Sequence, residues 1–155
     1  MDWRYCAAIN LLFITGGSFD DGKKLPEESP MIDVRLVESE DIINQSNGVV
    51  CWGNCNSEHM GFHIDNVDDS VWENLEVNTI NSEEVNISIE GERPPDVYGY
   101  FALTEKGNTT TGHNEYTGSN TFHIDESPSK YMVIAQWENE GGELQGYVYS
   151  VFETE

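Results

Sequence analysis

The sequence predicts an all-β fold, an antiparallel β-sandwich in the Ig-like or jelly-roll style with about eight or nine short strands. The hydrophobic fraction is only 37%, but it is rich in Val, Ile, Tyr, Phe and Trp, which suit half-buried strands. From Met31 onward, short apolar runs alternate with turn-forming clusters at fairly regular spacing. A chain of 155 residues has the usual size of a single domain, so we expect these strands to share one core.

The candidate strands are nine runs rich in branched and aromatic residues. Alternation is clearest in residues 85–90, where every second residue is apolar, the period of a strand with one face in water. Residues 138–143 contain two glycines and predict a hairpin connection between the last two strands. No helix longer than a turn or two is expected. In chain order, the nine runs are residues 31–37, 48–54, 59–65, 72–80, 85–90, 96–105, 120–125, 131–138 and 144–153.

The start of the chain differs in composition from the rest. Residues 1–18 have a weakly basic start, about ten mostly apolar residues and small residues at Gly16 and Ser18, which fit a signal peptide cleaved before Phe19. A buried N-terminal strand is the alternative interpretation of the same residues. Residues 19–30 hold two prolines and four acids and are predicted to form an acidic linker or arm. The sandwich domain is therefore expected to span residues 31–155.

The charge balance excludes several classes of protein. With 29 acidic and 7 basic side chains the formal charge is −22, so the clustered cations that nucleic-acid binding needs are absent from the sequence. The longest apolar run, residues 6–15, is much shorter than the roughly 20 residues of a membrane span. The acids are spread along the whole chain, which indicates a folded domain with an acidic coat. Such a coat is typical of halophilic proteins, because salt screens its self-repulsion; an ordinary acidic secreted or viral protein is the alternative.

Four candidate metal ligands, Cys51, Cys55, His59 and His63, recur at intervals of four residues. Two thiolates and two imidazoles form a ligand set that zinc or copper accepts. Neither one helix nor one strand brings all four to a single ion, because they would span about 18 Å or about 40 Å. We prefer a disulfide between Cys51 and Cys55, since removal of Cys6 with a signal peptide leaves an even count. Free thiols and a metal site remain open alternatives.

The same segment is similar to two families of copper proteins. The spacing Cys51-x3-Cys55-x3-His59 is similar to the binding loop of dinuclear copper centres, although Phe62 stands where those centres have a methionine. The segment from Val50 to Phe62 also resembles the strand that carries the first copper histidine in blue-copper proteins. No cysteine follows Cys55, whereas that family has one near its C-terminus. The resemblance implies a sandwich fold and copper as the cofactor, and it covers residues 50–62 only.

A polar stretch, residues 106–120, is predicted to be a long exposed loop, and such loops on a rigid β-scaffold commonly carry binding. Its candidate binding residues are Lys106, Asn108, His113 and Tyr116. Three Asn-x-Ser/Thr sequons would be glycosylation acceptors if the chain is exported, and they begin at Asn44, Asn86 and Asn108.

The sequence contains no GxSxG, HExxH or P-loop motif, so catalysis finds no support in it. We expect a non-enzymatic, exported surface or virion structural protein, without a cofactor, that works in high salt. Its partners would be proteins or further copies of itself, engaged through loops and strand edges. The second hypothesis is a small cupredoxin-like module that binds copper or zinc through the Cys/His segment. The third is an acidic inhibitor that imitates DNA.

Overall fold

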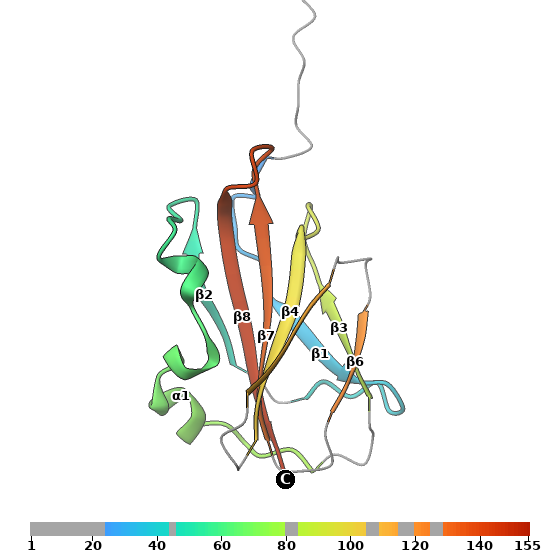
Figure 1. Ribbon diagram of the computed structural model, residues 1–155. Coiled ribbons are helices and arrows are strands. Elements are labelled where there is room, and N and C mark those ends of the chain that lie inside the picture. The colour runs from blue at the N-terminus through green and yellow to red at the C-terminus, as the bar shows by residue number, and fades with distance from the viewer. Residues whose placement is uncertain (1–23, 44–45, 80–83, 105–108, 115–119, 125–128) are drawn as a thin grey trace, which may run out of the picture.

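The computed structural model describes residues 24–43, 46–79, 84–104, 109–114, 120–124 and 129–155, and it has two antiparallel β-sheets (Figure 1). The all-β class predicted from the sequence is confirmed. In the three-stranded sheet the order is β1 (Ile32–Leu36), β3 (Glu84–Ile89) and β6 (Asn120–His123). In the five-stranded sheet the order is β2 (Ser46–Trp52), β8 (Leu144–Thr154), β7 (Ser129–Glu138), β4 (Val97–Thr104) and β5 (Thr109–Asn114).

The three central strands of the five-stranded sheet, β8, β7 and β4, are buried on both faces. Along β7, Tyr131, Val133, Ala135 and Trp137 belong to one core cluster, whereas Met132 and Ile134 belong to another, as the two-residue period of a strand requires. The first cluster, the inner core, also contains buried side chains of β1 and β3, so the three-stranded sheet covers this face. Strands that are buried on both faces are continuously apolar, which explains why β7 and β8 show no alternation of polar and apolar residues.

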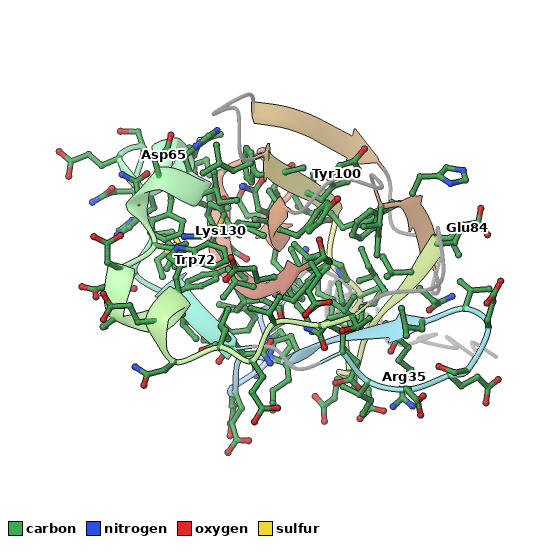
Figure 2. All side chains as sticks on the ribbon, turned by 90° about the horizontal axis from the view of Figure 1, so that it is seen from below. Arg35, Asp65, Trp72, Glu84, Tyr100 and Lys130 are labelled. Carbon is green, nitrogen blue, oxygen red and sulfur yellow. A yellow bond between two sulfur atoms is a disulfide. The ribbon has the colours of Figure 1, made fainter. Side chains whose placement is uncertain are left out.

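The segment between β2 and β3 covers the second face of the five-stranded sheet. Its described part contains the 3₁₀ helices η2 (His59–Gly61) and η3 (Ile64–Asn66) and the short helix α1 (Asp69–Glu73). Buried side chains of this segment complete the second core cluster, the outer core; they are Ile64, Val67 and Trp72. The amine of Lys130 on β7 lies 4.9 Å from the centre of the Trp72 ring (Figure 2). This cation–π contact helps to hold α1 against the sheet.

The strands predicted at residues 59–65 and 72–80 are therefore wrong. Local side chains compete with strand formation here, because they bond to nearby backbone groups. The side-chain oxygen of Asn66 accepts a hydrogen bond from the His63 backbone N–H at 2.8 Å. The Asp68 carboxylate accepts one from the Ser70 N–H at 2.8 Å and so caps α1. Residues 72 and 73 belong to α1, and residues 74–79 are irregular apart from an isolated bridge between Asn78 and Thr154.

The interpretation of residues 106–120 as one long loop is also wrong, because this stretch contains β5. The backbone of β5 pairs with β4 in antiparallel register, from Tyr98 opposite Asn114 to Leu103 opposite Thr109. Its sequence has no apolar alternation that would have revealed a strand, and only its β-branched threonines favour one.

The predicted hairpin at residues 138–143 is present. Asn139 and Glu143 exchange hydrogen bonds across it, and Gly142 adopts a positive φ of 77°. In the described part of the chain, no helix is long and apolar enough to cross a membrane.

Residues 24–30 have no regular secondary structure, but two contacts attach them to the inner core. Leu25 packs against the inner core, and the Pro26 carbonyl accepts a hydrogen bond from the Trp52 indole N–H at 3.0 Å. The Trp52 ring in turn meets Trp137 edge to face, with 5.1 Å between ring centres. The paired residue on β8 is Gly146, and only a residue without a side chain leaves room there for the indole.

Gly146→Ala is expected to lower the free energy of unfolding by about 1–3 kcal/mol, the usual cost of overpacking. The new methyl carbon would stand 2.5 Å from the Trp52 ring and 3.1 Å from Leu25. Urea unfolding followed by tryptophan fluorescence measures the change. Gly61→Ala is the matched control, because nothing lies within 4 Å of its added carbon. Equal stability of the two variants would contradict the packing described at Trp52.

Candidate functional site

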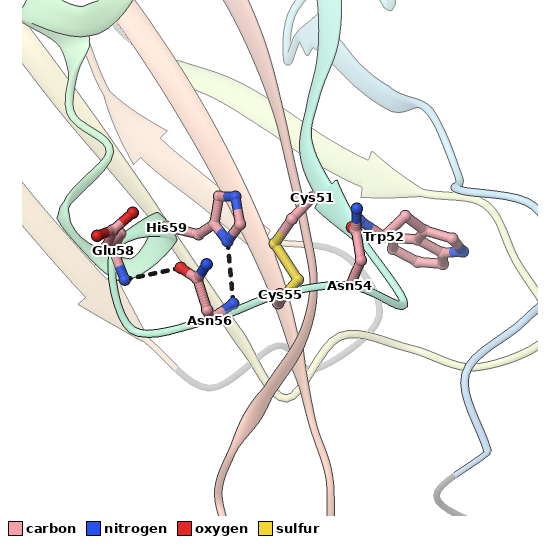
Figure 3. The surroundings of a disulfide bond; sticks show 7 residues. All are labelled: Cys51, Trp52, Asn54, Cys55, Asn56, Glu58 and His59. Atoms are coloured by element: carbon pink, nitrogen blue, oxygen red, sulfur yellow. Dashed lines mark hydrogen bonds between the residues drawn. A yellow bond between two sulfur atoms is a disulfide. The ribbon is translucent and has the colours of Figure 1, made fainter.

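The candidate site lies at the upper end of the molecule in Figure 1, where β7 turns into β8. Here β2 ends in the disulfide between Cys51 and Cys55, whose Cα atoms are 5.2 Å apart (Figure 3). Cys51 is almost completely buried in the outer core. Gly53, at the tip of the closed loop, has a positive φ of 76° and donates its N–H to the Gln145 carbonyl at 2.8 Å. The bond preferred from the sequence therefore joins the end of β2 to the segment that covers the sheet.

The two histidines of this segment have local partners. The Nδ1 atom of His59 accepts a hydrogen bond from the Asn56 backbone N–H at 2.9 Å, and the side chain of Asn56 accepts one from the Glu58 N–H (Figure 3). The His63 ring packs edge-on against Phe101, with 4.4 Å between ring centres. Both rings therefore help to fix the conformation of the chain over the sheet.

The predicted metal ligands Cys51, Cys55, His59 and His63 are not brought together. The two sulfur atoms are bonded to each other, so neither is a free thiolate, the form that binds zinc or copper. No group of three or more His, Cys, Asp or Glu side chains in the described part of the chain is arranged to hold a metal ion. The copper centre implied by the resemblance therefore does not fit this arrangement.

The other predicted site residues are spread over the chain. His113 lies in β5, where its backbone pairs with Gly99 of β4 rather than standing in an open loop. Asn86 lies in β3, the central strand of the three-stranded sheet, and lines a surface pocket of about 380 Å³. The remaining predicted residues lie outside the described part; they are Lys106, Asn108 and Tyr116 of the binding loop and the sequon residue Asn44.

Sequence reasoning missed a surface pocket of about 780 Å³ at the upper end. It lies between residues 24–30 and the turn that joins β3 to β4, residues 90–93. Four glutamates line it, two from each segment: Glu27, Glu28, Glu90 and Glu92. The sequence shows these two acidic pairs but not that the fold brings them together, because residues 31–89 lie between their segments.

Arg93 also lines this pocket, and it joins two turns. Its side chain is only 9% exposed and donates to the Asp96 carboxylate at 2.5 Å and to the Glu138 carbonyl at 2.6 Å. The same Asp96 oxygen accepts the Glu138 backbone N–H at 2.8 Å, and the Arg93 carbonyl accepts the Trp137 indole N–H at 3.0 Å. The β3–β4 turn and the β7–β8 hairpin are therefore joined through one buried, charge-assisted network.

The pKa shifts in the described part have structural causes. Burial raises the pKa of Tyr147 to about 12, a rise that a hydrogen bond with Gln136 partly opposes, while the Tyr147 hydroxyl donates to the Phe62 carbonyl at 3.1 Å. Burial also raises the pKa of Tyr149, and the negative charge of Asp68 adds to the effect. The hydrogen bonds from Ser70 lower the pKa of Asp68 itself. All three groups lie where the covering segment meets the five-stranded sheet.

Comparison with protein families, curated proteins and solved structures finds no match to this chain. Conclusions about its function therefore rest on the described residues and on the composition of the sequence.

Arg93→Met is expected to lower the free energy of unfolding by about 3 kcal/mol, because it leaves the Asp96 carboxylate largely buried without its cation. Arg35→Met is the matched control, since Arg35 also pairs with an aspartate, Asp33, at 3.3 Å but is 41% exposed. For this exposed pair we expect a loss below about 1 kcal/mol. Urea unfolding of both variants measures the difference, and similar losses would show that the Arg93 network does not join the turns as described.

Proposed function

We propose that the chain is a non-enzymatic, exported surface or virion structural protein, adapted to high salt, that binds protein partners or further copies of itself. The observation that carries this proposal is the disulfide between Cys51 and Cys55. Disulfides persist in oxidising environments, such as the outside of the cell or the surface of a virion, and are rare where thiols are kept reduced. The bond therefore supports export of the chain.

The finer architecture that goes with this proposal is an antiparallel β-sandwich in the Ig-like or jelly-roll style. Its support is the inner core, to which both sheets contribute. Ile32 and Val34 of β1 and Val85 and Ile87 of β3 share this cluster with buried side chains of β4, β7 and β8. Side chains that interdigitate between two sheets in this way form the core of a sandwich.

The proposed lack of catalysis is supported by what the reactive side chains do. His59 accepts a hydrogen bond from a backbone N–H, and the His63 ring packs against Phe101. The Asp96 carboxylate accepts hydrogen bonds from the Arg93 side chain and the Glu138 N–H. A catalytic base needs a free lone pair within reach of a substrate, whereas the Nδ1 atom of His59 already accepts a backbone hydrogen bond. The strand edges and the pocket at the upper end are then the surfaces left for binding.

The mass of the chain purified from its own source tests export. We expect a chain that begins near Phe19, carries no metal and is two hydrogens lighter than its reduced form, because Cys51 and Cys55 are joined. Native and denaturing mass spectrometry without reductant make the measurement. The same sample after reduction is the control and gains two hydrogens. A full-length, reduced chain, or one that carries stoichiometric metal, would overturn the proposal.

Unfolding by urea at two salt concentrations tests the adaptation to high salt. The free energy of unfolding is expected to be higher in 2 M than in 0.1 M NaCl, because the Debye length falls from about 10 Å at 0.1 M to about 3 Å at 1 M. A variant in which Glu27, Glu28, Glu90 and Glu92 are all changed to Gln removes four charges from one pocket. Its stability should depend less on salt. Stability that is unchanged or lower in 2 M NaCl would contradict this part of the proposal.

A further inference from the structure

Strand β2 forms an open edge of the five-stranded sheet. It pairs with β8 on one side, and among the residues that the structure describes no strand pairs with its other side. An unpaired edge presents backbone N–H and C=O groups that can pair with another strand. Of the β2 side chains, Val49 is the most exposed, at 52%.

The edge formed by β2 is electrically neutral although the chain has a formal charge of −22. No Asp, Glu, Lys or Arg occurs between Asp41 and Glu58, and this is the longest stretch of the sequence without such a residue. The neighbouring strand β8 likewise has none between Glu143 and Glu153. Residues 146–151 of β8, which pair with β2, are mostly buried, so the uncharged surface is that of β2 alone, and we call β2 the neutral edge.

A second exposed apolar side chain lies beside the neutral edge. The Ile32 backbone N–H donates to the Asn47 side chain of β2 at 3.1 Å, which places the preceding residue, Met31, next to β2. Met31 is 64% exposed. Val49 follows Asn47 by two residues and so projects from the same face of β2. The open strand edge thus carries one exposed apolar side chain, Val49, and has a second, Met31, beside it.

We propose that the neutral edge is the contact between two copies of this chain, with the two β2 strands paired antiparallel about a two-fold axis. The inference deepens the proposed function and rests on its self-assembly part. A cationic partner would be attracted to the acidic coat rather than to the neutral edge, because the side chains of β2 carry no negative charge. A partner as acidic as this chain is repelled by the coat and can approach only where the charge is absent. Antiparallel pairing of two identical strands is also self-complementary, as a two-fold contact must be.

The length of the contact follows from a bulge within β2. The register with β8 shifts between Val49 and Cys51, and such a bulge ends regular pairing at a sheet edge. The copies are therefore paired over Ser46 to Val49, a short segment that gives a weak contact. Repulsion between two coats of −22 opposes it, and salt relieves that repulsion. We expect monomers in dilute buffer and dimers in molar salt.

Sedimentation velocity of the full chain in 0.1 M and 2 M NaCl tests the inference. Val49→Glu places a charge on the neutral edge, and at 2 M NaCl we expect it to raise the dissociation constant of the dimer at least tenfold. Val37→Glu is the matched control: Val37 is 42% exposed, but it lies just after β1 and lines the pocket on the three-stranded sheet. This variant should dimerise as the unchanged chain does. Val49→Thr keeps the branched shape, and circular dichroism checks that each variant is folded.

A chain that stays monomeric at both salt concentrations would overturn the inference, as would equal weakening by Val49→Glu and Val37→Glu. The outcome is separable from that of the proposed function. An exported, disulfide-bonded chain that remains a monomer refutes the neutral-edge contact alone. A salt-dependent dimer of a full-length, reduced chain refutes export alone.

Discussion

The structure depends on covering both faces of the five-stranded sheet. Strands β7 and β8 direct large apolar side chains alternately to either side, so neither face can be left in water without exposing several of them. The three-stranded sheet covers one face and the segment after β2 covers the other. The remaining interactions attach the three-stranded sheet and the segment after β2 to the five-stranded sheet. The disulfide at Cys51 fixes the start of the covering segment, the cation–π contact of Lys130 fixes α1, and the Arg93 network fixes the β3–β4 turn.

The strands were predictable where the apolar pattern was strong and the chain had no local alternative. Residues 85–90 alternate cleanly, and β3 occupies nearly the same range. Phe62 and Ile64 alternate just as well, yet they lie in and beside 3₁₀ turns, because side chains such as Asn66 bond to the nearby backbone. Strand β5 had no apolar signal at all; its only regular pairing in the described part is with β4, which sequence periodicity does not reveal.

The candidate site was predictable only where it depends on neighbours in the chain. The disulfide between Cys51 and Cys55 follows from a count and a short separation. The acidic pocket and the Arg93 network do not, because their parts come from segments far apart in the sequence. Arg93 lies in a turn rich in proline and acids, where an exposed cation is the usual expectation. Its burial depends on the Glu138 carbonyl of the β7–β8 hairpin, which is distant in the sequence and accepts a hydrogen bond from Arg93.

The distribution of charge connects stability with association. A coat of net charge −22 keeps copies of the chain apart and weakens the fold itself, and salt relieves both effects. If the charge were spread evenly, high salt would allow contact anywhere on the surface. The contact that we propose at the neutral edge would remove that ambiguity, because β2 has no charged side chain and the bulge after Val49 would keep the contact short. An acidic coat interrupted along one strand thus favours a single geometry of pairing over general aggregation.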